Sequence, residues 1–320
     1  MSLFTSWLAS PPPDAAIEIA SDRISAAVLG SRGASPVVQA YAVEPLPAGA
    51  VIPSLTAPNI VDQTTVTAVL RRTVEKLGTR PARVALVLPD SSARVSLVRF
   101  DTIPARREDL DQLVRWQVKK AAPFPVDDAM VTYSPGARSA DGAAEFLVEL
   151  ARRDVIAQYE DVCDRAGLYA GLIDLATLGV VNLFLASPDV PTDDWLLVHM
   201  RPEYTSLVIM RDRDVIFFRS RPDSEEDTLA DAVHQTAMYY QDRLAGHGFS
   251  RVLLGGHGRT PGALDAARRS LEERLGAIVE PADPTRTAAL TDRISTNADL
   301  SDILSPLLGM LLRAQREAAA

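Results

Sequence analysis

Few residues in the sequence have the types and spacing that catalysis requires. The four histidines show neither a His-Glu-x-x-His pattern nor His-x-x-x-His spacing, so a zinc site is not expected. No Gly-x-x-x-x-Gly-Lys-Ser/Thr segment is present to cradle phosphates, and no Gly-x-Ser-x-Gly elbow is present to carry a nucleophilic serine. The sequence therefore does not predict a zinc enzyme, a P-loop nucleotidase or an α/β-hydrolase.

One glycine-rich turn could bring a nucleotide close to the main chain. Gly255, Gly256 and Gly258 follow a short buried-type strand, and glycine allows close approach because it has no Cβ. The same pattern is also typical of an ordinary strand-to-helix turn. Three acidic pairs near predicted elements are interpreted as helix-start charges or solvated faces, not as paired catalytic carboxylates. These pairs are Asp127-Asp128, Asp193-Asp194 and Glu225-Glu226.

Composition and charge narrow the class of protein. The 320 residues are 47% hydrophobic and 23% charged, which indicates globular structure and, by length, about two domains. The 33 basic and 42 acidic residues give a net charge of −9, which argues against a face for nucleic acid or anionic lipid. Cys163 is the single cysteine, so no intrachain disulfide can form, which fits a reducing compartment.

No membrane-spanning segment is predicted. The longest apolar stretch, 168–186, is interrupted by Asp174 and Asn182, whereas a span needs about 20 residues without charge. The first residues lack the basic region and long apolar core of a signal peptide. Apolar residues between 3 and 8 would share one helical face, which predicts a short helix that docks on its own domain or contacts a membrane or partner.

The same order of elements is predicted twice. Three strands, a helix and a buried strand occupy 15–88, and the same series occupies 195–254, which indicates a duplicated α/β unit and not a barrel or a single Rossmann domain. The first series has strands over 15–20, 23–29, 36–43 and 84–88 and a helix over 62–77 capped by Asp62. The second has strands over 195–200, 205–210, 215–219 and 251–254 and a helix over 225–244.

An inserted subdomain is predicted between the two series, because the intervening chain is too long for a loop. It has a strand over 92–100, a helix over 106–120, paired strands over 129–133 and 144–150, and a helix that Asp154 caps and that runs to 167. A strand over 168–173 and a helix over 175–186 follow. The predicted division is a first lobe over 1–190, with the insert at about 92–170, and a second lobe over 191–320.

These residues carry a family likeness. The segment 113–133, "LVRWQVKKAAPFPVDDAMVTY", resembles the PilM family of type IV pilus assembly proteins, in which a helix with a central aromatic runs into a Pro-Phe-Pro turn and then a strand. Trp116 and Phe124 match that pattern. The segments 172–184, 253–264 and 300–313 are also similar. The resemblance implies an actin-like (ribonuclease H-like) fold, with duplicated βββαβ lobes around a cleft and an inserted subdomain in the first lobe.

The resemblance also implies where a nucleotide would lie. In the superfamily two hairpin turns with Asp and Gly hold the phosphates of ATP and its magnesium. Glu18 and Ala20 stand at the first turn, which includes Ser21 and Asp22, and His199, Arg201 and Pro202 stand at the second. Proline offers no N–H, and neutral histidine is a poor magnesium ligand. Only Gly255 and Gly256, on the adenosine side, match. The cleft is therefore predicted to be degenerate, with no cofactor expected and ATP with magnesium bound weakly at most.

The resemblance implies a cytoplasmic adaptor that is peripheral to the inner membrane and contacts other pilus assembly proteins. Its partner would be the cytoplasmic tail of a PilN-like membrane protein, in a groove between the first lobe and the insert. Trp116 and Phe124 are interpreted either as core of the insert, the favoured interpretation, or as groove walls for this partner. Two alternatives stay open: a functional ATP-binding ATPase or phosphotransferase, and the cytoplasmic domain of a type II secretion assembly protein (GspL-like).

Overall fold

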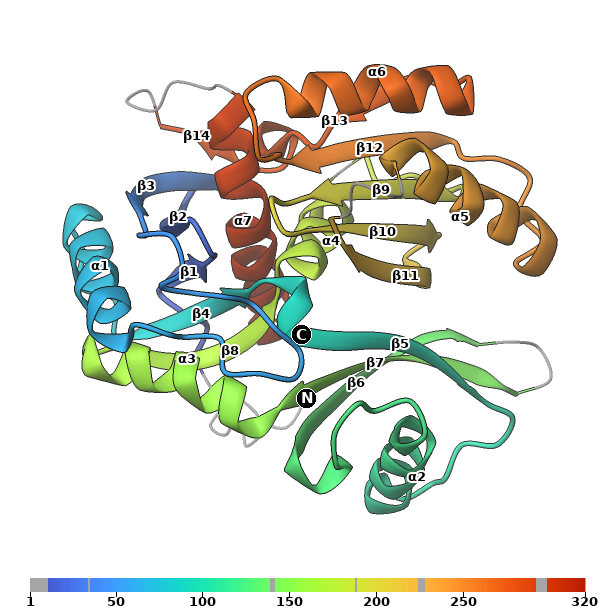
Figure 1. The fold of residues 1–320 in the computed structure, drawn as a ribbon, viewed down its shortest axis with the longest axis horizontal. Helices are drawn as coiled ribbons and strands as arrows, with labels where there is room; N and C mark the ends of the chain where they lie inside the picture. Colours follow the sequence, from blue (N-terminus) through green and yellow to red (C-terminus); the bar gives the residue numbers. More distant parts are fainter. Residues whose placement is uncertain are drawn as a thin grey trace.

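In the computed structural model the chain forms three β-sheets and the helices that cover them (Figure 1). The structure describes residues 11–33, 35–138, 142–187, 189–223, 228–291 and 298–319. The helix expected over 3–8 lies outside these described residues. The predicted α/β class is confirmed.

The first sheet contains the opening hairpin that the sequence predicts. Across the sheet its strands are β14 (Ala289–Leu290), β3 (Ser35–Pro45), β2 (Arg23–Arg32), β1 (Ala15–Ile19), β4 (Arg83–Leu88) and β8 (Tyr169–Leu175). β1 and β2 are antiparallel, with Ile17 opposite Ala26. The Ala20 amide closes the turn by donating to the Arg23 carbonyl over 3.0 Å. β8 lies at the edge and pairs in parallel with β4.

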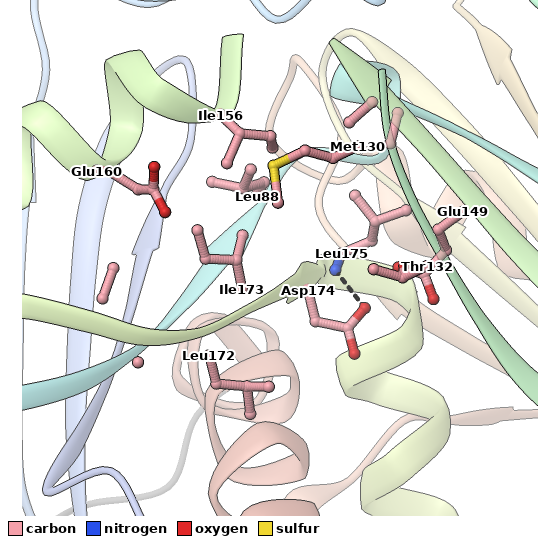
Figure 2. Close-up of a pocket in the computed structure, with 14 residues that line it drawn as sticks. Leu88, Met130, Thr132, Glu149, Ile156, Glu160, Leu172, Ile173, Asp174 and Leu175 are labelled. Carbon is pink, nitrogen blue, oxygen red and sulfur yellow. Dashed lines mark hydrogen bonds between the residues drawn. The ribbon is translucent and has the colours of Figure 1, made fainter. Parts of the chain in front are cut away.

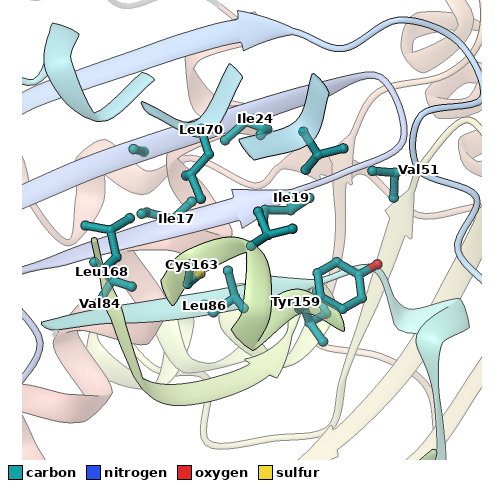
Figure 3. Packing of buried hydrophobic residues seen from close by; sticks show 14 of the residues in the cluster. Ile17, Ile19, Ile24, Val51, Leu70, Val84, Leu86, Tyr159, Cys163 and Leu168 are labelled. Atoms are coloured by element: carbon teal, nitrogen blue, oxygen red, sulfur yellow. The ribbon is translucent and has the colours of Figure 1, made fainter. Parts of the chain in front are cut away.

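Helices cover both faces of this sheet. On one face α1 (Gln63–Lys76) and α3 (Arg153–Arg165) pack over a core that includes Ile17 and Ile19 of β1, as Figure 3 shows. On the other face α7 (Ala298–Ala319) packs on a second core that includes Ala16. Successive β1 residues thus point to opposite faces, as strand geometry requires, and both faces are buried.

The second sheet repeats the strand order of the first. Its strands are β11 (Asp214–Pro222), β10 (Tyr204–Arg211), β9 (Trp195–Met200), β12 (Arg251–Gly256) and β13 (Val279–Pro281). α5 (Leu229–Arg243) and α6 (Ala263–Leu275) cover one face. Against the other face lies α4 (Ala176–Ala186), whose Val181 and Phe184 pack with Leu197 of β9. α4 thus connects the first lobe to the core of the second.

The insert is a three-stranded antiparallel sheet with a helix on one face. Its order is β5 (Ala93–Phe100), β7 (Ala144–Arg152) and β6 (Ala129–Arg138), and α2 (Arg107–Lys119) packs on the side of Phe146 and Val148. The opposite face turns toward the first lobe, because Leu147 and Ala151 belong to the core beneath α1 and α3. Short 3₁₀ turns at Asp90–Ser92, Val126–Asp128 and Pro284–Arg286 connect elements.

Three predicted features are wrong in detail. The last part of the chain does not stay with the second lobe: β14 pairs with β3, and α7 packs on the first sheet, because the apolar face of α7 matches the uncovered side of β1 and β2. Asp154 does not cap α3, which begins after Arg152. The helix predicted over 225–244 includes Thr228, but the Thr228 side chain accepts from the Asp231 amide and caps α5, which begins at Leu229. Residues 225–227 lie outside the described residues.

Candidate functional site

The turns at the ends of β1, β9 and β12 meet in the cleft between the two lobes, and a buried ion pair joins them. Arg201, just after β9, donates to the Glu18 carboxylate at the end of β1. The two side chains are only 3% and 2% exposed. Ser25 on β2 donates to the second oxygen of Glu18 over 3.2 Å. The guanidinium of Arg201 therefore joins the end of β9 to the end of β1.

Asp302 of α7 contacts three basic side chains in this cleft. Its carboxylate lies 2.6 Å from Arg23 Nη2, 2.8 Å from His257 Nδ1 and 3.6 Å from Arg201 Nη1. Burial alone would raise the pKa of Asp302, but Arg201, His257 and Arg23 hold it well below its usual range. Asp302 is therefore ionised at neutral pH and joins both lobes to the C-terminal helix.

His257 extends the same network to the tip of the first hairpin. Its Nε2 lies 3.3 Å from the carboxylate of Asp22. Burial lowers the pKa of His257, but the hydrogen bonds to Asp22 and Asp302 outweigh this effect and raise it above the usual value. Ser21 at the same tip donates to Glu203 beside β10. Both residues of the first turn thus contact the second lobe.

A second polar cluster lies deeper in the cleft around Asp90, which follows β4. Thr177 of α4 and Ser206 of β10 both donate to its carboxylate. Burial raises the pKa of Asp90 despite these hydrogen bonds. His199 of β9 lies 2.7 Å from Thr177 Oγ1 through its Nδ1, and burial, with Arg201 nearby, lowers its pKa to about 3. His199 is therefore neutral at pH 7.

Other atoms of the chain fill the space next to Gly255 and Gly256. A Cβ added at Gly256 would lie 1.9 Å from the Met200 carbonyl oxygen, and one at Gly255 would lie 2.8 Å from Ala282 Cβ. The Gly256 φ of 95° also favours glycine. Packing of β12 on Met200 of β9 and on Ala282, just after β13, accounts for both glycines without a ligand.

The cleft thus brings together all five residues that the sequence assigns to a degenerate nucleotide site. Glu18 contacts Arg201, Ser21 contacts Glu203, and Asp22 contacts His257, the residue that follows Gly255 and Gly256. Sequence reasoning missed the cations and the carboxylate that pair there: Arg23, His257 and Asp302. Arg23 and Asp302 are 279 positions apart, so no local spacing marks them. No group of three or more His, Cys, Asp or Glu residues among those described could hold a metal ion.

A pocket of about 280 Å³ lies between the first lobe and the insert (Figure 2). β8, the edge strand of the first sheet, forms one wall, and β6 and β7 of the insert form the other. Met130, Ile156 and Ile173 give it apolar sides, while Glu149 and Asp174 lie together at one end. The outward main-chain groups of an edge strand can pair with an added extended segment.

The two aromatic residues of the Pro-Phe-Pro segment lie elsewhere on the insert. Trp116 on α2 is 58% exposed, with Lys120 Nζ 5.0 Å from its ring centre, so the favoured interpretation of Trp116 as core is wrong. Phe124 packs against the core beneath α2. Neither lines the pocket of Figure 2, and their part in partner binding stays a prediction.

Comparison with known families decides where the chain belongs. The family model for the type IV pilus assembly protein PilM matches residues 16–224. The chain belongs to the PilM family. No curated protein sequence matches it significantly. The resemblance stated from the sequence is thereby confirmed.

A solved structure agrees with this assignment at the level of the fold. A structure of a PilM–PilN type IV pilus biogenesis complex is similar with a TM-score of 0.81 at 16% identity, over 95% of this chain and 99% of that one. The ethanolamine utilization protein EutJ of Carboxydothermus hydrogenoformans scores 0.49 at 12% identity, covering 95% and 90%. The cytoplasmic domain of EpsL of the Vibrio cholerae type II secretion system scores 0.46 at 9%, covering 95% and 94%. The actin-like fold expected for a PilM-family chain is confirmed.

Within the described part of this PilM-family chain, no helix is both long and apolar enough to cross a bilayer.

Proposed function

We propose that this protein is a cytoplasmic scaffold of the type IV pilus inner-membrane platform, and that it binds the cytoplasmic tail of a PilN-like membrane protein in the pocket between β8 and the insert. The observation that carries the proposal is this pocket, in a chain of the PilM family. An extended tail could pair with the free edge of β8 and place apolar side chains against Met130 and Ile173. In the similar solved complex, PilN is the component bound to PilM.

The test is binding of a fluorescent tail peptide from the PilN-like protein to the full chain. Ala170 is half-buried in the pocket wall, so Ala170→Trp should fill the pocket and abolish the anisotropy change. Met238→Ala, at an exposed position on α5 of the second lobe, is the control and should bind as the wild type does, and Trp116→Ala tests the α2 face of the insert. Loss of binding in Trp116→Ala alone would move the partner to the α2 face, and no binding by the wild type would refute the proposal.

We also propose that the cleft does not act as a nucleotide switch. Arg201 already neutralises Glu18, Asp302 contacts two arginines and His257, and the glycines of the adenosine side pack on Met200 and Ala282. ATP would have to break these buried contacts before binding, and each charge-assisted hydrogen bond is worth roughly 1.5–3 kcal/mol. We expect at most about millimolar affinity and no turnover.

Isothermal titration with ATP, with and without magnesium, tests this second proposal. Weak binding that magnesium does not change is the expected result. Tight binding that requires magnesium would show that the cleft opens and that Glu18 serves a metal site. If binding is absent, the combined variant Glu18→Asp, Ala20→Gly, His199→Asp and Pro202→Gly shows whether the cleft geometry can still accept a nucleotide.

A further inference from the structure

Glu149 is an unpartnered carboxylate in the wall of the pocket. It lies on β7, the central strand of the insert sheet, opposite Val95 on β5 and Thr132 on β6. This row faces the first lobe, and Figure 2 labels the Glu149 carboxylate beside Thr132 and near Asp174. Among the described residues, no donor or cation pairs with Glu149. Glu149 is half-buried, and a carboxylate that is partly removed from water without such a partner is harder to ionise than an exposed one.

All the charged residues that line the pocket are acidic. Asp174 of β8 and Glu160 of α3 also line it, Asp90 lies behind, and no lysine, arginine or histidine is among its lining residues. The nearest cation is Arg313 of α7, which donates to Asp174 over 2.6 Å and to Glu317 over 2.7 Å. Arg313 is therefore already paired with two other carboxylates.

This environment changes the protonation of Glu149. Burial, together with the charge of Asp174, raises its pKa to about 8, although Arg313 opposes the change. In the free protein the group is mostly protonated at pH 7. A cation placed next to it would favour the ionised form, so entry of a cation would release a proton.

The rest of the pocket suits the stem of a long basic side chain. Leu88, Met130 and Ile156 lie toward the other end from Glu149 and present apolar surface. Lysine and arginine bury an aliphatic stem on such surface while the charged end reaches a polar group. A pocket with apolar sides and a carboxyl group without a partner in its wall is complementary to that shape and charge.

We infer that the segment bound in this pocket presents a cation, a lysine or arginine side chain or its own N-terminal ammonium group, to Glu149. The inference rests on the proposed function, since the occupant is the tail of the PilN-like protein. Glu149 then acts as the residue that selects a basic tail and fixes its position along β8. A neutral segment would leave the Glu149 carboxyl group protonated, would form no ion pair with it and would bind more weakly.

The experiment combines variants of the protein and of the peptide. The full chain is titrated with the native tail peptide and with peptides in which arginine is replaced by citrulline, lysine by norleucine, or the amino terminus is acetylated. Glu149→Gln should weaken the native peptide at least about tenfold at pH 8, the effect of one lost charged hydrogen bond. One neutralised peptide should lose the same factor with the wild type and lose nothing further with Glu149→Gln.

Two controls separate this role from a structural one. Glu145→Gln lies four residues away on the same strand, does not line the pocket, and should bind normally. Wild-type affinity should rise from pH 6 to pH 8, whereas that of Glu149→Gln should stay flat. The peptide series needs no variant protein, so it decides the question even if Glu149→Gln folds poorly.

The outcomes distinguish the inference from the proposed function. One outcome is that the wild type binds the native peptide, that Glu149→Gln binds it equally well and that the wild type binds every neutralised peptide equally well. In that case the pocket does not recognise a cation, so the inference is wrong and the proposed function stands. If the wild type binds no tail peptide at all, both are wrong.

Discussion

Replacing Arg201 by methionine should destabilise the protein severely. Arg201 is the buried cation between two carboxylates, Glu18 and Asp302, which are at most 4% exposed. Removing it leaves Glu18 with only a hydroxyl donor, Ser25. Asp302 keeps Arg23 and His257, so most of the cost falls on Glu18. Breaking a buried ion pair in this way costs about 3–5 kcal/mol of unfolding free energy.

Two further variants test whether the loss of stability comes from the unpaired Glu18 carboxylate. Arg259→Met removes an exposed arginine near the same turn, 3.3 Å from Asp223, and should cost at most about 1 kcal/mol. Adding Glu18→Gln to Arg201→Met removes the unpaired carboxylate, so the double variant should recover part of the loss, by about 1–3 kcal/mol.

The assay is urea unfolding of each full-length variant, followed by circular dichroism and by tryptophan fluorescence. Both probes should report the same transition if unfolding is two-state. The reasoning is refuted if Arg201→Met loses no more stability than Arg259→Met, or if the double variant is less stable than Arg201→Met, since either result means that Glu18 does not depend on this pair.

Three other consequences can be measured. Gly309→Ala would place a methyl group 1.7 Å from the carbonyl oxygen of residue 179, where α7 crosses α4, and should lower the free energy of unfolding by about 1–3 kcal/mol. Gly136→Ala should cost clearly less, because its methyl group would lie 3.4 Å from the nearest atom, the carbonyl oxygen of Glu145. Equal melting temperatures of the two variants in thermal unfolding would contradict this. The histidines give opposite pH effects in urea unfolding. The raised pKa of His257 gives stability that is present below about pH 6.5 and is lost as pH rises through the folded pKa. The lowered pKa of His199, about 3, makes the wild type lose stability as pH falls below about 6.5. His257→Gln and His199→Gln should each remove their own effect, and unchanged pH profiles would count against both assignments. Burial raises the pKa of the Cys163 thiol to about 12, so it should not react with Ellman's reagent until urea unfolds the protein, and rapid reaction of the native chain would contradict the packing.

Local patterns in the sequence were enough to predict most elements of the fold. The strand-like runs over 15–20 and 23–29, on either side of Ser21 and Asp22, predicted a hairpin that the structure has, and Asp62 caps α1 as expected. These features depend on neighbours within a few positions. The placement of α7 could not be predicted in this way, because it depends on which sheet has an uncovered apolar face after the other elements have packed.

The candidate site was predicted only in part for the same reason. Resemblance to the family located Glu18 and the Gly255-Gly256 turn in one cleft. The partners that occupy that cleft come from distant elements, Asp302 from α7 and Arg201 from the second hairpin, and ion pairing between them follows from the tertiary fold alone. Glu149 carries no sequence signal at all, since an alternating strand presents many such acidic positions, and only the pocket makes this one distinctive.

Hydrogen exchange of the full chain, with and without the tail peptide of the PilN-like protein, tests most directly where the partner binds. Binding along the free edge of the first sheet predicts slower exchange in β8, residues 169–175, and no change at the cleft turns over 18–23 and 199–204. Protection of the cleft turns with unchanged exchange in β8 would contradict this placement and would indicate that the partner binds in the interlobe cleft.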